Sequence, residues 1–143
     1  MTDVLDKPKE NIVVSHGDQP IKIGVIGLGY VGLPVAISLS RAFPTIGFDV
    51  DERRVSTLKQ GIDWTEEFSS EDLQKADIEY YSDIQKLASC NFFVVAVPTP
   101  VTAGNSPDFS MLKSACALIG PAIQPGSIVV FESTVYPGAT EDI

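Results

Sequence analysis

The chain is 143 residues long, which is about the length of one domain and too short for a two-domain enzyme. Hydrophobic residues make up 44% and charged residues 20%, a balance that is typical of a globular protein with a buried core and excludes a disordered chain. The 10 basic and 19 acidic residues give a net charge of −9, and no stretch is rich in lysine or arginine. Nucleic acid and anionic membrane surfaces are therefore not expected partners.

The first 20 residues mix polar, charged and apolar groups without a period, and we expect them to form a flexible leader. They contain the only histidine, His16, which has no second histidine or cysteine nearby to form a metal site. No run approaches the roughly 20 apolar residues that span a bilayer, and acidic residues stand where a secretory signal needs basic and apolar ones. With two cysteines in the chain, the expected location is the reducing cytoplasm.

The next segment predicts a strand, a turn, a helix and a second strand. Residues 21–26 are a β-branched run that ends in glycines, which is typical of a buried parallel strand. Apolar residues then recur at helical spacing over residues 31–42. Residues 45–48 predict a second strand that ends at Asp49, and residues 51–60 predict an amphipathic helix.

The rest of the chain repeats this alternation. Residues 62–76 are acidic and weakly periodic, with a helix start at Ser69. A short strand, a helical turn and a strongly apolar strand are predicted at residues 78–81, 84–88 and 92–97, and a buried strand is predicted at residues 127–131. A loop at residues 103–107 is followed by a predicted helix, in which Leu112, Ala115, Cys116 and Ile119 are expected to face inward. We therefore predict an α/β fold, a single Rossmann-type domain with a doubly wound parallel sheet over residues 21–143.

The sequence Gly-Leu-Gly-Tyr-Val-Gly at residues 27–32 matches GxGxxG between a predicted strand and a predicted helix, the context that gives this motif meaning. Gly27 can make the tight turn, Gly29 lets the backbone approach a pyrophosphate, and Gly32 allows the helix to pack closely on the strand. The amides of Tyr30 and Val31 would then face the phosphates, supported by the helix dipole. An acidic chain can thus hold an anion without basic side chains.

Asp49 follows Gly27 by 22 residues, at the end of the second predicted strand. A carboxylate at this position can accept hydrogen bonds from both ribose hydroxyls of an adenosine and repels a 2′-phosphate, so NAD is favoured over NADP. Asp49 could instead cap the helix at residues 51–60. Arg53 and Arg54 would suit the 2′-phosphate of NADP. We give Asp49 more weight in the choice of cofactor, and we expect Arg54 to contact the adenosine side of NAD.

Five segments in chain order resemble the N-terminal NAD-binding domain of the nucleotide-sugar 6-dehydrogenases, the UDP-glucose/GDP-mannose dehydrogenase family. They are residues 27–34, 47–51, 97–100, 107–108 and 132–141. Within the last segment, residues 132–138 are most similar to the branch that oxidises UDP-N-acetylglucosamine or its galactosamine epimer. UDP-N-acetylmannosamine and UDP-glucose enzymes remain alternatives.

The resemblance implies oxidation of the C6 alcohol of a UDP-sugar to a carboxylate by two NAD molecules in turn, with a cysteine thiolate that captures the intermediate aldehyde. Such reactions supply precursors of surface polysaccharides. The resemblance also implies that Thr99 contacts the cofactor. Thr134 would lie near the nicotinamide and orient the hydrolytic water, which makes it our one catalytic candidate. Without the resemblance, Thr99 could be interpreted as a loop residue with a purely structural role, and Thr134 as a residue that ends a strand or caps a helix.

In the family, the nucleophilic cysteine and its partners lie downstream of the matched region. We interpret both Cys90 and Cys116 as small apolar residues that are buried in the core. We therefore expect the sugar-binding and catalytic domain to be absent, NAD to bind without turnover, and the full-length protein to be a homo-oligomer. A non-catalytic nucleotide-sensing Rossmann module and the cofactor domain of another NAD-dependent dehydrogenase remain alternatives.

Overall fold

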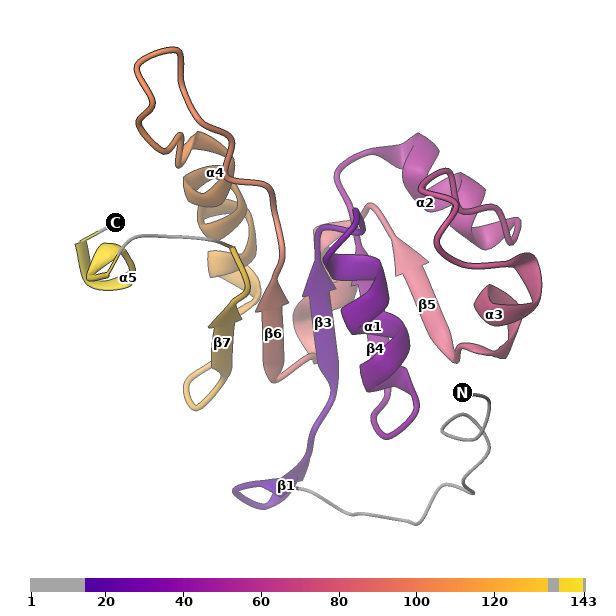
Figure 1. Cartoon of the computed structure of the whole chain (residues 1–143). Helices are drawn as coiled ribbons and strands as arrows, with labels where there is room; N and C mark the ends of the chain where they lie inside the picture. Colours follow the sequence, from indigo (N-terminus) through magenta and orange to yellow (C-terminus); the bar gives the residue numbers. More distant parts are fainter. Residues whose placement is uncertain (1–14, 134–136, 143) are drawn as a thin grey trace.

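The structure is a computed structural model, and it describes residues 15–133 and 137–142. Figure 1 shows an α/β arrangement in which strands and helices alternate along the chain. In chain order the elements are β1 (Ser15–His16), β2 (Gln19–Pro20), β3 (Ile23–Ile26), α1 (Gly32–Ser40), β4 (Thr45–Phe48), α2 (Glu52–Lys59), α3 (Ser70–Lys75), β5 (Ile78–Tyr81), η1 (Ile84–Ser89), β6 (Phe92–Val95), α4 (Ser110–Ile119), η2 (Gly120–Ala122), β7 (Ile128–Phe131) and α5 (Ala139–Asp142).

The main sheet of the described residues has five parallel strands in the order β5-β4-β3-β6-β7. From β3 the chain builds outward through β4 to β5, and it then crosses to the other side of β3 to add β6 and β7. The direction of winding reverses between β3 and β6. Ligands of open α/β sheets bind at such a reversal, beyond the carboxyl ends of the strands.

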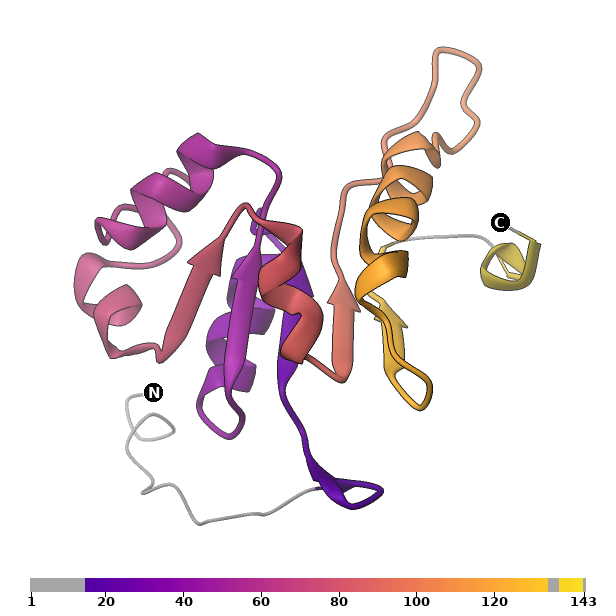
Figure 2. The same cartoon turned by 180° about the vertical axis from the view of Figure 1, so that it is seen from behind.

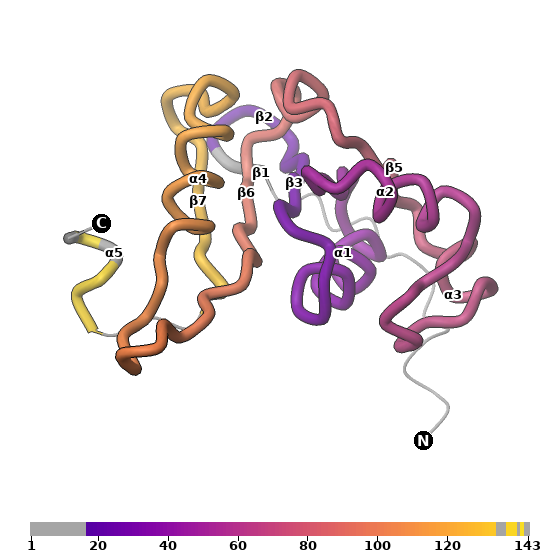
Figure 3. Tube along the Cα trace, turned by 90° about the horizontal axis from the view of Figure 1, so that it is seen from above, coloured from indigo at the N-terminus to yellow at the C-terminus, as the bar shows by residue number. Residues whose placement is uncertain are grey.

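Helices cover both faces of the sheet, as predicted for a doubly wound fold. On one face α1, α2 and α3 pack through Leu33, Val55 and Leu73 onto the sheet. On the other, η1 and α4 pack through Leu87 and Leu112. Figure 3 shows α1 and α4 on opposite sides of the sheet, and Figure 2 shows the face covered by η1 and α4. The burial of apolar surface on both faces explains why the central strands are apolar throughout.

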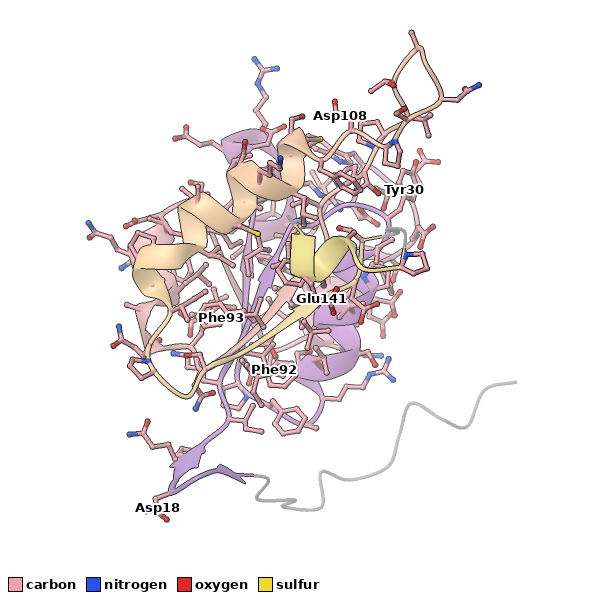
Figure 4. All side chains as sticks on the ribbon, turned by 90° about the vertical axis from the view of Figure 1, so that its left-hand side faces the viewer. Asp18, Tyr30, Phe92, Phe93, Asp108 and Glu141 are labelled. Atoms are coloured by element: carbon pink, nitrogen blue, oxygen red, sulfur yellow. The ribbon has the colours of Figure 1, made fainter. Side chains whose placement is uncertain are left out.

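Neighbouring residues of β6 illustrate this two-sided burial. Phe93 is fully buried among the residues that pack under α4, and Phe92 packs against the cluster under α1. Figure 4 labels both side chains. Because successive side chains of a strand point to opposite faces of the sheet, two adjacent apolar residues are both buried only if helices cover both faces.

Two segments differ from the sequence prediction. The strand predicted to be buried at residues 127–131 is β7, whose residues Ile128–Phe131 are each half-buried, because β7 pairs only with β6 among the described strands. Residues 15–20, expected to be part of a flexible leader, form the short antiparallel pair β1–β2 around Gly17, whose φ is +64°. Asn91 fixes the end of this pair, since its Nδ2 donates to Pro20 O at 2.9 Å. None of the helices in the described ranges has the length and apolarity to cross a membrane.

The helix start predicted at Ser69 is confirmed as a capping box at α3. The Ser69 hydroxyl accepts from Asp72 N at 3.1 Å, and the Asp72 carboxylate accepts from Ser69 N at 3.0 Å. Both bonds satisfy amides that the helix itself leaves unpaired.

Ser69→Ala removes one half of this box. We expect it to lower the free energy of unfolding by about 0.5–2 kcal/mol, measured by urea denaturation. Ser82→Ala is a matched control, because Ser82 is also exposed and no side-chain hydrogen bond is recorded for it among the described residues. Equal stabilities of the two variants would contradict a stabilising role for the cap.

Candidate functional site

A cleft of about 840 Å³ lies at the carboxyl ends of β3, β4 and β6, where the winding of the sheet reverses. Its walls are the glycine loop at residues 27–31, residues 48–51 at the end of β4, residues 96–99 after β6, one side of α4, and Trp64. Figure 4 labels Tyr30 at this end of the sheet. The structure thus brings together the predicted residues Gly27, Asp49, Arg54 and Thr99 in one cleft.

The backbone around the three glycines of the loop is crowded at two positions and open at the third. Gly27 has φ +93°, and a Cβ there would lie 2.9 Å from Ala96 O. A Cβ on Gly32 would collide with Gly27 O, so α1 starts directly against the loop. A Cβ on Gly29 would meet no atom within 4 Å. The backbone is therefore tight at Gly27 and Gly32 and open at Gly29.

The amides at the start of α1 are available to an anion. No side chain in the described ranges caps this helix, and its first turn contains no acid. The Gly29 and Val31 carbonyls accept from Leu33 N and Val35 N at 3.2 and 3.3 Å, whereas the structure gives the amides of Tyr30 and Val31 no acceptor among the described residues. Unpaired amides at a helix N-terminus fit a phosphate group, which supports the predicted pyrophosphate position.

Asp49 holds the glycine loop in place. Its Oδ2 accepts from Leu28 N and its Oδ1 from Asp51 N, both at 2.9 Å. The alternative that Asp49 caps α2 is wrong, because Asp51 is the cap and accepts from Arg53 N and Arg54 N. The Asp49 carboxylate is half-buried at the cleft wall and retains acceptor capacity beyond these two bonds, so it fits the predicted contact with ribose hydroxyls.

Arg54 lines the cleft, and its guanidinium contacts the protein through Nε and Nη1, whereas Nη2 is buried and has no hydrogen-bond partner among the described residues. Only 2% of the residue is exposed. Its Nε donates to Leu28 O at 2.7 Å, and its Nη1 lies 2.9 Å from Asp63 Oδ1. Leu28 is therefore held at its amide by Asp49 and at its carbonyl by Arg54, and Arg54 positions the loop. Its expected contact with the adenosine stays a prediction.

Asp63 organises the turn that follows α2. Its carboxylate accepts from Thr65 N and Oγ1, from Glu67 N and from Phe68 N, at 2.8–3.2 Å. Burial alone would raise the pKa of Asp63, but the hydrogen bonds from Thr65, Arg54 and Phe68 outweigh it and leave the pKa below its usual range. Nearby, burial raises the pKa of Tyr80 to about 12, so this phenol stays neutral beside the Arg54–Asp63 pair.

The segments after β6 and β7 meet at the cleft. Thr99 is half-buried in its wall. Ser133 Oγ donates to Val97 O at 2.7 Å, and Glu132 N donates to Val95 O at 2.9 Å, so these two segments lie side by side. Thr134, the residue after Ser133, lies outside the described residues, and its role stays a prediction.

Neither cysteine has the character of a nucleophile. Cys90 is buried under η1, and burial raises the pKa of its thiol to about 11, against the opposing charge of Lys22. Cys116 was expected to face inward, but it is half-buried, because it lies at the margin of the inward face of α4 defined by Leu112, Ala115 and Ile119. Burial also raises the pKa of the Cys116 thiol.

Sequence reasoning missed Asp63 and Trp64. They stand in the acidic, weakly periodic stretch at residues 62–76, where no helical or strand pattern marks a residue as important. The signal that could have found them is compositional: Trp64 is the only tryptophan of the chain, and it lies in a loop close behind α2.

Comparisons with known proteins agree with this geometry. The model of the UDP-glucose/GDP-mannose dehydrogenase family, NAD binding domain, matches residues 21–143. The chain is 42% identical over 127 residues to UDP-N-acetyl-D-glucosamine 6-dehydrogenase of Salmonella typhi, covering 88% of this chain and 30% of the relative. It is 43% identical over 123 residues to the protein of the same name from Pseudomonas aeruginosa, covering 85% and 29%. The chain thus spans about 30% of the length of these relatives.

Solved structures give the same picture. A ternary complex of GDP-mannose dehydrogenase from Pseudomonas aeruginosa superposes with a TM-score of 0.77 at 29% identity, covering 86% of this chain and 30% of that one. The UDP-D-ManNAc dehydrogenase of Pyrococcus horikoshii gives a TM-score of 0.79 at 29% identity, covering 85% and 30%. Both matches confirm the predicted Rossmann-type fold.

Proposed function

Because the chain belongs to the UDP-glucose/GDP-mannose dehydrogenase family, as its NAD-binding domain, we propose that it is the cofactor-holding part of a UDP-N-acetylhexosamine 6-dehydrogenase. One observation carries the proposal: the unpaired amides of Tyr30 and Val31 lie with the Asp49 carboxylate in a single cleft at the sheet's winding reversal. These groups match the pyrophosphate and the ribose of a dinucleotide.

The residues of this chain bind and orient the cofactor. The amides of Tyr30 and Val31 would take the pyrophosphate, and Asp49 would take the adenosine ribose hydroxyls. Thr99 would contact the cofactor beyond β6, and Thr134 would lie near the nicotinamide and orient the hydrolytic water. When bound, NAD supplies the hydride acceptor for oxidation of the C6 alcohol. Arg54 and Asp49 act earlier, by fixing the Leu28 peptide so that the loop is preformed.

The remaining parts of the activity belong to the longer protein. We propose that a cysteine beyond Ile143 is the nucleophile, that two NAD molecules are consumed for each uronic acid, and that the product feeds surface polysaccharide synthesis. Support for the N-acetylhexosamine substrate comes from the names of the relatives at 42–43% identity. We also expect that protein to be a cytoplasmic homo-oligomer.

NADH binding to the 143-residue chain tests the cofactor part of this proposal. Saturable enhancement of NADH fluorescence is expected. Gly29→Asp should weaken the affinity by about 100-fold, because it places a carboxylate where the pyrophosphate lies. The fold should tolerate it, since a Cβ at Gly29 meets no atom within 4 Å and an acid suits a helix N-terminus.

Gly104→Asp is the matched control, because Gly104 is exposed and a Cβ there would lie 3.9 Å from its nearest neighbour, Thr102 Oγ1. It adds the same charge away from the cleft and should leave the affinity unchanged. Equal affinities of the two variants would contradict the proposal. To separate an enzyme from a nucleotide sensor, NAD and UDP-N-acetylglucosamine are supplied to the longer protein: an enzyme forms NADH, and a sensing module does not.

A further inference from the structure

Trp64 stands at the cleft although no part of the GxGxxG motif predicts it. It is the only tryptophan of the chain, it is 50% exposed, and it lines the same cleft as the glycine loop and Asp49. A half-exposed tryptophan on a soluble domain is a large apolar surface left in contact with water. Its position in the cleft wall leaves it accessible to a ligand.

The protein holds this ring in a defined place. The Arg54 guanidinium carbon lies 5.1 Å from the centre of the Trp64 ring, within range of a cation–π interaction. Arg54 itself is fixed by Leu28 O and Asp63. Asp63, the residue before Trp64, is bonded to three backbone amides of the same turn. The ring is therefore held in two ways. It contacts Arg54, which is bonded to the glycine loop, and it belongs to a turn whose backbone is fixed by Asp63.

The layout of the cleft assigns a ligand group to Trp64. With the pyrophosphate at Tyr30 and Val31 and the ribose at Asp49, the adenine base needs a surface on the far side of the ribose. Besides the glycine loop itself, the large apolar residues that line the cleft and are exposed are Val50, Trp64 and Met111. Val50 directly follows Asp49, and Trp64 contacts Arg54, so both belong to the wall formed by α2 and its turn, whereas Met111 belongs to α4. Of these two, Trp64 alone offers a flat aromatic face.

We propose that Trp64 is the platform against which the adenine ring of NAD stacks, and that the Arg54–Asp63 pair positions it. The inference rests on the proposed occupation of the cleft by a dinucleotide. It extends that proposal by assigning base recognition to the turn after α2, which lies outside the glycine motif. Stacking tolerates any purine, so Trp64 contributes affinity for the adenosine half and none for the nicotinamide half.

Tryptophan fluorescence of the unmodified chain tests the contact directly, because it reports on Trp64 alone. ADP-ribose and AMP, which contain the adenosine half, should change the fluorescence saturably, and nicotinamide mononucleotide should not. Binding of ADP-ribose, shown by calorimetry, without any change in the fluorescence would overturn the proposal.

Three variants separate stacking from simple packing. Trp64→Ala should weaken ADP-ribose binding by about 5- to 100-fold, and Trp64→Leu by a similar factor, because both lose the aromatic face. Trp64→Phe should stay within about fivefold of wild type. Thermal unfolding of each variant is measured in parallel. Variants that lose stability but keep wild-type affinity would show that Trp64 only shields Arg54, and would overturn the proposal. Failure of the unmodified chain to bind NADH would overturn the proposed function as well, so the two failures are distinguishable.

Discussion

Asp63→Asn is expected to lower the free energy of unfolding by about 3–5 kcal/mol at neutral pH. The change keeps the shape of the side chain and removes its charge, which leaves the Arg54 guanidinium buried without its counter-ion. Removing one partner of a buried ion pair is costly, because the other charge has been taken out of water without compensation. Urea denaturation followed by circular dichroism measures the difference.

The difference should also depend on pH, with a sign that follows from the depressed pKa of Asp63. Since the carboxyl is more acidic in the folded chain than in the unfolded one, its stabilising contribution is complete above its unfolded pKa of about 4. The contribution is lost as the pH falls through the folded value. Wild type and Asp63→Asn should therefore converge in stability on acidification below about pH 4.

Asp77→Asn controls for the loss of one negative charge, because Asp77 is an exposed aspartate of the same acidic region. It should change stability by less than about 0.5 kcal/mol at every pH. A stability of Asp63→Asn within about 1 kcal/mol of wild type at neutral pH would contradict a structural role for the pair.

Asp49→Asn is expected to weaken NADH binding by about 10- to 100-fold and to reduce the preference for NADH over NADPH by a similar factor. The carboxylate accepts hydrogen bonds from ribose hydroxyls and repels a 2′-phosphate. The amide accepts these hydrogen bonds poorly, and because it is neutral it does not repel the phosphate. The amide oxygen can still accept from Leu28 N, so the loop keeps its main tether. Parallel fluorescence titrations with the two cofactors give the ratio.

Asp51→Asn is the matched control for this variant. Asp51 also lines the cleft and loses the same charge, and asparagine caps a helix as well as aspartate does. It should therefore keep α2 intact and leave the ratio of the two affinities within about threefold of wild type. If both variants changed the ratio of the NADH and NADPH affinities equally, the preference for NADH would be set by net charge. A direct contact of Asp49 with the ribose would then be contradicted.

The order of the elements and the position of the cleft could be predicted because their signals are local. A β-branched run, a glycine motif and a helical period each lie within a dozen residues, and the predicted strand at residues 45–48 matches β4 (Thr45–Phe48). The tight backbone at Gly27 and Gly32 could also be predicted, since crowding at these two positions depends only on a strand turning directly into a helix.

Contacts between distant residues could not be predicted in this way. The bonds of Arg54 to Leu28 and Asp63 are an example, because these residues lie 26 residues before it and nine after it. Nothing in the local pattern distinguishes a guanidinium that binds a ligand from one that fixes a loop. The half-burial of β7 was missed for a related reason: an apolar strand has the same sequence at a sheet's centre and at its edge, and only the order of the strands decides.

The central claim is that the start of α1 and the end of β4 hold NAD together. Backbone amide NMR spectra of the ¹⁵N-labelled chain, titrated with NAD, test it most directly. We predict saturable shifts concentrated at Gly29, Tyr30 and Val31, with smaller shifts at Val50 and at the Trp64 indole. Saturable shifts confined to the separate hollow beside α2, α3 and β5, around Leu73 and Tyr81, or the absence of any saturable shift, would contradict it.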